Sequence, residues 1–262
     1  MSILTVENLR IAFGGVVAID GVSFAVRPGE IFALIGPNGA GKTTLFNMVS
    51  GIYVPDGGRI FLSGENVTNL APPQLARRGL SRTFQNLQVF FRMTAAENVM
   101  VGRHLHERRN VFAHILSLPS VHAQNRTTRA EAERLLQLVG LGGIGDKPAS
   151  SLPYGALKRL EIARALATEP KILLLDEPAA GCNPVETEEI DAVIKKIAAQ
   201  GVTVVLVEHD MRLVMRISDR IHVLDRGRTL AEGNAEEVRT NPTVITAYLG
   251  GLGEREAAHA RH

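Results

Sequence analysis

A glycine-rich loop directly after a short apolar run constrains the fold of this chain more than any other feature. The run Ile31 to Ile35 has the length of a buried strand, and the loop that follows has the spacing G-x-x-x-x-G-K-T. In that spacing the glycines let successive backbone N–H groups point inward around a polyphosphate, and the next helix presents its positive N-terminus. The loop consists of Gly36, Pro37, Asn38, Gly39, Ala40, Gly41, Lys42, Thr43 and Thr44. It predicts a site for a nucleoside triphosphate.

Two side chains of this loop have expected roles. Lys42 should reach the β- and γ-phosphates, and Thr43 should supply a hydroxyl to Mg²⁺. The alternative is a glycine-rich turn that fits the pattern by coincidence. The helix-forming residues 45–49 after the loop argue against coincidence, because the motif requires a strand before it and a helix after it.

A second apolar run ends in two carboxylates. Residues 171–178 read K-I-L-L-L-D-E-P, and a continuous apolar run of this length predicts a strand buried on both faces of a parallel sheet. Open α/β sheets bind ligands beyond the carboxyl ends of their strands, so Asp176 and Glu177 should lie near the phosphates. We expect Asp176 to hold Mg²⁺ through water, and Glu177 to orient and deprotonate the attacking water. The alternative is a strand that simply ends in solvated acids.

Five further segments add to these two motifs. They are residues 11–15 (I-A-F-G-G), 81–86 (S-R-T-F-Q-N), 152–157 (L-P-Y-G-A-L), 181–184 (G-C-N-P) and 207–210 (V-E-H-D). Singly each is weak: Phe13 fits a core aromatic, Gln85 carries little information, and His209 fits a structural or solvated histidine. In this order and at these spacings they resemble the ATP-binding subunits of ABC transporters, and the resemblance covers residues 3–250.

The resemblance implies that ATP is the nucleotide. Phe13 would stack on the adenine, and His209 would contact the γ-phosphate. Lys42, Glu177 and His209 are then the expected catalytic residues. Gln85 would touch Mg²⁺ and report to a membrane subunit, so the expected metal site combines Gln85 with Thr43 and Asp176.

The segment at 152–157 corresponds to the family's signature motif. Family members dimerise head to tail, so Pro153, Tyr154 and Gly155 would contact, in trans, the ATP held by a second ATPase subunit. The sequence departs from the family here, with Pro153 in place of serine and Leu157 in place of glutamine. Proline suits a helix start but offers no hydroxyl to the phosphate. We expect the N–H groups of Tyr154 and Gly155 and the helix dipole to remain available as donors.

Several phrases narrow the resemblance to the ATPases of branched-chain amino acid importers. They are residues 81–86, Tyr154, residues 159–166, residues 176–181 and residues 247–250. Importers of amides and urea and the ATPase of lipopolysaccharide export share parts of this pattern, so these solutes remain alternatives. The implied partners are a second ATPase subunit, of the same or another sequence, two transmembrane permeases and, indirectly, a periplasmic solute-binding protein. A non-transport ABC ATPase and a small-molecule kinase are the alternatives from other classes.

Composition agrees with a peripheral membrane-associated role. The 262 residues are 45% apolar and 21% charged, with a net charge of +2, which gives no strong field for nucleic acid. No run reaches the roughly 18 apolar residues of a membrane span, and the N-terminus lacks the pattern of a signal peptide. The single cysteine, Cys182, excludes an intrachain disulfide and fits a reducing cytosol. We expect attachment through the permeases, at the cytoplasmic face of the inner membrane.

The expected fold class is α/β: a P-loop NTPase of the ABC type, with a mostly parallel core sheet, a small antiparallel β region and an inserted helical lobe. Residues 5–10, 16–26 and 59–62 alternate like strands and would form the antiparallel region. From Thr94 to Val139 the apolar spacing becomes helical. The predicted organisation is a single ATPase domain at 1–250, with the lobe at 86–165 and a family-type tail at 241–250, followed by a flexible tail at 251–262.

The lobe also contains a locally basic stretch. It consists of Arg103, His104, His106, Arg108, Arg109, His122, Arg126 and Arg129. A solvated helix face is the simplest interpretation, and proximity to anionic lipid headgroups under the permease is the alternative.

Overall fold

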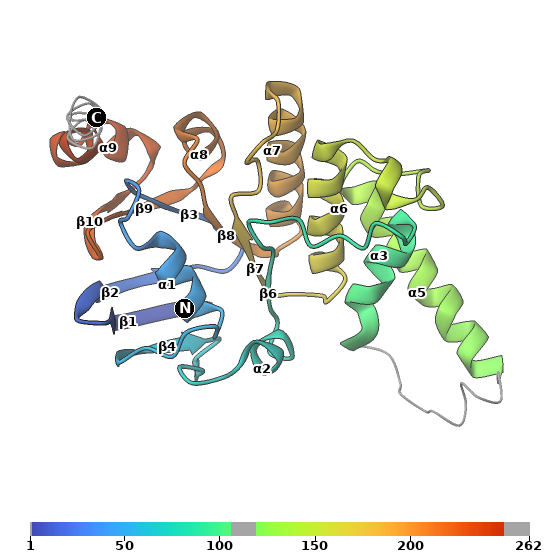
Figure 1. Cartoon of the computed structure of the whole chain (residues 1–262), viewed down its shortest axis with the longest axis horizontal. Coiled ribbons are helices and arrows are strands. Elements are labelled where there is room, and N and C mark those ends of the chain that lie inside the picture. Colours follow the sequence, from blue (N-terminus) through green and yellow to red (C-terminus); the bar gives the residue numbers. More distant parts are fainter. Residues whose placement is uncertain (1, 106–118, 249–262) are drawn as a thin grey trace.

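The computed structural model describes residues 2–105 and 119–248, which form two β-sheets and a group of helices to one side of them (Figure 1). The larger sheet has six strands in the order β10-β9-β3-β8-β7-β6. Its strands are β3 (Ile31–Ile35), β6 (Leu80–Arg82), β7 (Ile172–Asp176), β8 (Thr203–Val207), β9 (Arg220–Asp225) and β10 (Arg228–Gly233). All neighbouring pairs are parallel except β9 with β10. The predicted mostly parallel core sheet is therefore confirmed.

Both faces of this sheet are covered, which explains the continuous apolar runs in its strands. Every residue of β3, β7 and β8 is buried. Successive side chains of a strand point to opposite faces. In β3, Ile31, Ala33 and Ile35 accordingly pack with the core formed by the helices, whereas Phe32 and Leu34 pack with α1 (Lys42–Val49) and the smaller sheet.

The smaller sheet is antiparallel and has the order β2-β1-β4-β5. Its strands are β1 (Leu4–Phe13), β2 (Val16–Val26), β4 (Gly57–Leu62) and β5 (Glu65–Asn66). It lies beside α1 in Figure 1. The predicted antiparallel region is confirmed, with β1 and β4 longer than expected and β5 added.

The other described elements are helices and 3₁₀ turns. They are α2 (Pro72–Ala76), α3 (Ala95–Gly102), α5 (Pro119–Leu138), α6 (Tyr154–Leu166), α7 (Pro184–Ala199), α8 (Met211–Ile217) and α9 (Ala235–Thr240), with 3₁₀ turns η1 (Arg103–Leu105) and η2 (Ala149–Ser151). Residues 242–248 are also helical. Among the described residues, no helix combines the length and the apolar character that crossing a bilayer requires.

Helices α3, α5 and α6 pack together on one side of the molecule (Figure 1). The apolar face predicted near the end of α5 is buried, since Ala132, Leu135, Leu136 and Val139 are at most 3% exposed. Thr94 begins α3 with a capping box, accepting from the N–H of Glu97 while the Glu97 carboxylate accepts from the N–H of Thr94. The helices predicted from the apolar spacing are thus confirmed for the described residues in this part of the chain.

The basic stretch is not uniformly solvated. The side chain of Arg103 is only 13% exposed and donates to Glu169 at 2.9 Å, so the interpretation as a solvated face is wrong for this residue. Arg129 pairs with Asp146 at 2.8 Å and with Glu133 at 3.0 Å. Residues 106, 108 and 109, the side chain of His122 and the tail at 251–262 lie outside what the structure describes.

Candidate active site

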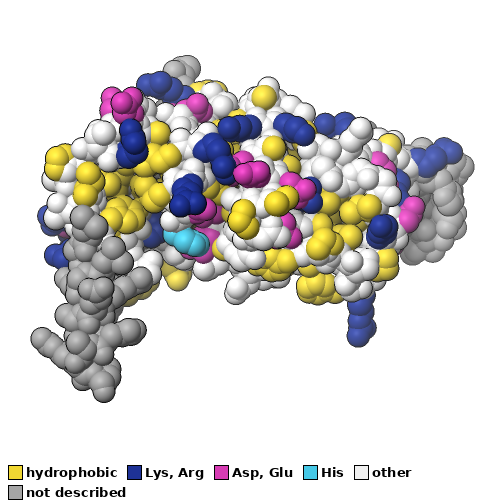
Figure 2. Space-filling model, turned by 90° about the horizontal axis from the view of Figure 1, so that it is seen from above, with side chains coloured by type: hydrophobic (Ala, Val, Ile, Leu, Met, Phe, Trp, Pro, Cys, Tyr) yellow, Lys and Arg dark blue, Asp and Glu magenta, His cyan; other side chains and the backbone are white. Residues whose placement is uncertain are grey.

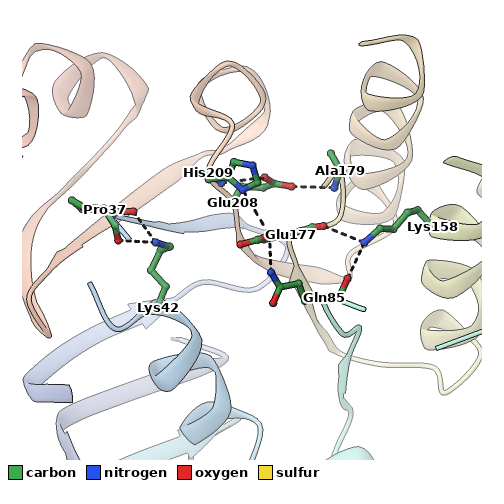
Figure 3. A network of polar contacts seen from close by, with 9 residues as sticks. Pro37, Lys42, Gln85, Lys158, Glu177, Ala179, Glu208 and His209 are labelled. Carbon is green, nitrogen blue, oxygen red and sulfur yellow. Dashed lines mark hydrogen bonds and ion pairs between the residues drawn. The ribbon is translucent and has the colours of Figure 1, made fainter. Parts of the chain in front are cut away.

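The candidate site lies where four neighbouring parallel strands end. The glycine-rich loop follows β3, Glu177 follows β7, His209 closely follows β8, and Gln85 comes three residues after β6. The carboxyl ends of parallel strands meet at one edge of a sheet, which brings these segments together. Figure 3 shows Gln85, Glu177 and His209 close together, with Lys42 to one side beside Pro37. Figure 2 shows the molecule from above, with a histidine beside acidic side chains and basic side chains close by.

The glycine-rich loop needs its last glycine for a steric reason. Gly41 has φ +100° immediately before α1, and a Cβ there would lie 2.8 Å from the carbonyl oxygen of Ala18. Both the left-handed conformation and the close approach exclude other residues. The end of the loop therefore packs tightly against Ala18 and Ile19 of β2 directly before α1 begins.

The side chain of Lys42 bonds to the first two residues of this loop. Its Nζ donates to the carbonyl oxygens of Gly36 at 2.7 Å and of Pro37 at 3.0 Å. Burial lowers the pKa of Lys42, and the nearby charge of Glu177 partly opposes that shift. An anion that enters the loop would restore a favourable environment for the ammonium group.

Glu177 is held at the centre of the site in an unusual backbone conformation. Its φ is +47°, and its N–H donates to the carbonyl oxygen of Val207 at 2.9 Å. Its Oε2 accepts from Nε2 of Gln85 at 3.2 Å and lies 3.8 Å from Nδ1 of His209. The side chain of Glu177 is 23% exposed and that of His209 is 61% exposed, so solvent reaches both groups.

Asp176 forms a buried ion pair with Arg82. Nη2 of Arg82 donates to Oδ2 of Asp176 at 2.7 Å, and both side chains are less than 10% exposed. Nη1 of Arg82 donates to Oδ1 of Asn47 at 2.7 Å and to Oγ of Ser50 at 2.6 Å. Arg82 thus ties the end of β7 to α1, a role that no sequence motif indicated.

The groups available for a cation are few. Thr43 presents an exposed side chain in the first turn of α1, and Asp176 ends β7. Within residues 2–105 and 119–248, no group of three or more His, Cys, Asp or Glu side chains could hold a metal ion.

The signature segment begins helix α6. Pro153 is the N-cap residue and Tyr154 is the first helical residue. The N–H of Gly155 donates to Oε1 of Glu186 at 3.1 Å, so the expectation that this N–H is available is wrong for the isolated chain. The carboxylate of Glu186 therefore occupies the helix N-terminus at which a phosphate from a partner was expected.

Aromatic side chains mark the region expected to hold the base. The ring of Phe13 is 46% exposed and packs edge-on against Tyr53, with 5.4 Å between ring centroids. An exposed Phe13 fits a stacking role better than a core role. Tyr53 was not predicted, because it follows α1 and is distant from Phe13 in sequence.

Two buried charged residues, Lys158 and Glu208, form hydrogen bonds to the main chain of the site (Figure 3). The sequence analysis assigned no role to either. Lys158 of α6 is 3% exposed, and its Nζ donates to the carbonyl oxygens of Gln85 at 3.3 Å and of Glu177 at 3.5 Å. Glu208 is 1% exposed and accepts from the N–H groups of Ala179 and His209. The position of Glu208 directly before His209 was the only available signal.

A groove of about 1040 Å³ lies beside the Gln85 segment, between α2 and the helical lobe. Its lining includes Pro72, Arg77, Phe84, Phe90, Val101 and Arg164. Phe84 and Phe90 are each nearly half exposed. The groove thus presents both apolar and cationic groups next to the site.

The sheet order and the loop after β3 define the class of the protein: it is an α/β phosphate-loop NTPase. The family model described as ABC transporter matches residues 19–180, and the one described as branched-chain amino acid ATP-binding cassette transporter matches residues 228–253. The high-affinity branched-chain amino acid transport ATP-binding protein BraF of Pseudomonas aeruginosa is 47% identical, over 95% of this chain and 98% of the relative. The corresponding protein LivG of Escherichia coli K12 is 45% identical over the same shares.

Solved structures agree. The ADP conformation of MJ1267, an ATP-binding cassette of an ABC transporter, has a TM-score of 0.83 and 32% identity over 95% of this chain and 99% of that one. A dimeric post-hydrolysis state of the cassette MJ0796, bound to ADP and Pi, has a TM-score of 0.74 and 25% identity over 88% and 98%. The chain belongs to the ATP-binding proteins of ABC transporters, the family that BraF and LivG represent.

Proposed function

We propose that this chain is the ATP-hydrolysing subunit of an importer for branched-chain amino acids, with Glu177 as the general base. The names of BraF and LivG and the match of residues 228–253 support the solute class. Relatives at 45–47% identity over nearly the full length make this solute class a better-supported choice than amides, urea or lipopolysaccharide.

The observation that carries the proposal is the convergence of Lys42, Gln85, Glu177 and His209 at the ends of neighbouring strands. A base must lie within hydrogen-bond reach of the water that it activates, and Glu177 is solvent-accessible at the centre of this group. Lys42 would exchange its bonds to loop carbonyls for the β- and γ-phosphates, and His209 would donate to the γ-phosphate.

The rest of the loop would bind ATP through its N–H groups. Phe13 would stack on the adenine. Mg²⁺, held by Thr43, Asp176 and Gln85, would neutralise charge that develops on the β- and γ-phosphates. The dimeric state of MJ0796 supports a second ATPase subunit, whose Pro153, Tyr154 and Gly155, or their equivalents, would complete the site in trans.

We infer that the groove beside Gln85 receives a permease, so that attachment to the cytoplasmic face of the membrane occurs through protein contacts. Residues 1–250 would act as one ATPase domain, with residues 86–165 as the lobe that carries the signature and residues 241–250 as its tail. A periplasmic solute-binding protein would deliver the amino acid to the permeases.

Nucleotide binding by Lys42→Ala tests the phosphate-loop assignment. Equilibrium binding of ATP with Mg²⁺ should be lost in this variant, because Lys42 supplies the cation at the mouth of the loop. Lys196→Ala is a matched control, since Lys196 is exposed in the last turn of α7. Retained micromolar affinity in Lys42→Ala would refute the assignment.

Reconstitution tests the solute. The chain, its permeases and the binding protein should be purified as a complex and placed in liposomes. ATPase activity and uptake of labelled leucine should rise together when the binding protein is loaded with leucine. Stimulation by urea or an amide, with none by leucine, isoleucine or valine, would replace the proposed solute.

A further inference from the structure

Glu208 is a buried carboxylate that joins two segments of the active site. It directly follows β8, and its side chain is 1% exposed. Oε1 accepts from the N–H of Ala179 at 3.0 Å, and Oε2 accepts from the N–H of His209 at 3.1 Å. Burial raises the pKa of Glu208, and these N–H donors partly oppose that shift. Figure 3 shows Glu208 between His209 and Ala179.

The bond to Ala179 matters because of the backbone at Glu177. A glutamate at φ +47° is strained, and such a conformation persists only where the surroundings enforce it. On one side, the N–H of Glu177 donates to the carbonyl oxygen of Val207. On the other side, two residues later, Ala179 is anchored by Glu208. Val207 ends β8 and Glu208 directly follows it. The end of β8 therefore holds the chain both at Glu177 and two residues after it.

We propose that Glu208 is a positioning residue for ATP hydrolysis, which holds Glu177 and His209 in a fixed relation at the γ-phosphate. The proposal rests on the function assigned above to those two residues. A carboxylate suits the task because each of its oxygens can accept from a different N–H group. Glutamine has one acceptor oxygen and a donating NH₂ group, which would face a second donor. Alanine would leave the buried N–H of Ala179 and the part-buried N–H of His209 without this partner.

Glu208→Gln is the decisive variant. In steady-state assays its kcat should fall by about tenfold or more, since a small displacement of a catalytic group has large effects on rate. KM and the Kd for ATP should stay within about threefold, because Glu208 makes no contact with the phosphate loop among its described bonds. Glu208→Asp keeps both acceptor oxygens and shortens their reach, so its kcat should lie between those of the parent and Glu208→Gln.

Glu30→Gln is the matched control. Glu30 is also buried and accepts from a main-chain N–H, that of Arg27, at 2.7 Å, but it also pairs with Arg220 at 2.9 Å, precedes β3 and therefore lies at the opposite edge of the sheet. A merely structural role for Glu208 predicts that, for a given loss of melting temperature, kcat falls no further in Glu208→Gln than in Glu30→Gln, and that result would overturn the proposal. If Glu208→Gln does not fold, Glu208→Asp is judged by the same criteria.

A combined variant separates this proposal from the assignment of Glu177. If Glu208 acts through Glu177 and His209, adding Glu208→Gln to a protein that already carries Glu177→Gln and His209→Ala should lower the residual rate by less than about threefold. A further tenfold loss would show an independent effect and overturn the proposal. Hydrolysis at the parent rate by Glu177→Gln alone would instead refute the proposed function.

Discussion

The buried pair Arg82–Asp176 leads to a quantitative stability prediction. Arg82→Leu would leave the carboxylate of Asp176, which is 6% exposed, without its 2.7 Å partner. Removing one member of a buried ion pair costs about 3–5 kcal/mol, because the remaining charge stays desolvated. Arg82 also donates to Asn47 and Ser50, so the loss includes the contact between β7 and α1. For a chain of this size, about 1 kcal/mol shifts the melting temperature by ~2–4 °C. The expected decrease is therefore at least about 6 °C.

Thermal unfolding followed by circular dichroism, without nucleotide, measures this effect. Arg228→Leu is the control, because Arg228 pairs with Asp20 while its own side chain is 73% exposed. Solvent screens such a pair, and its loss should shift the midpoint far less. An Arg82→Leu midpoint within about 2 °C of the parent, the smallest shift expected for 1 kcal/mol, or equal to that of Arg228→Leu, would show that the pair does not hold β7 to α1 as described.

Three further predictions concern dimer closure and coupling. In the reconstituted complex, Gln85→Ala should weaken the stimulation of ATPase by loaded binding protein more than it weakens ATP binding; equal losses would leave Gln85 an ordinary polar residue. In a Glu177→Gln background with ATP, Glu186→Gln should lower the dissociation constant of the dimer several-fold, since it removes the negative charge now bonded to Gly155; sedimentation velocity over a dilution series would show no change if that contact is irrelevant. In the same background and assay, Pro153→Ser should lower the dissociation constant of the ATP-bound dimer roughly tenfold, because one hydrogen bond to a charged group contributes about that factor. An unchanged dissociation constant would mean that the backbone donors suffice.

The fold was largely predictable from the sequence because its core strands are buried on both faces. Residues 31–35, 172–175 and 204–207 are continuous apolar runs, the pattern that a parallel strand covered on both sides requires. β6 escaped prediction because it has only three residues, two of them polar. It is specified by pairing with β7 rather than by its own pattern.

The site was predictable only where a motif fixes both residue type and spacing. Lys42 and Glu177 belong to such motifs, and the structure brings them to the same edge of the core sheet, beyond β3 and β7, which are separated by β8. No motif fixed the roles of Arg82, Lys158 and Glu208, because the role of a buried charge depends on partners far away in sequence. Single-sequence patterns carry no information on such contacts. The availability of the Gly155 N–H was misjudged for the same reason, since Glu186 lies 31 residues away.

The most direct test of the central claim is hydrolysis by Glu177→Gln, followed in the same sample as dimerisation. The variant should bind ATP with Mg²⁺, sediment as a dimer and hydrolyse ATP about 10²- to 10⁴-fold more slowly than the parent, because a general base is removed while the phosphate contacts remain. Hydrolysis at the parent rate, or a failure to bind ATP at all, would contradict the assignment of Glu177 as the base of this ATPase.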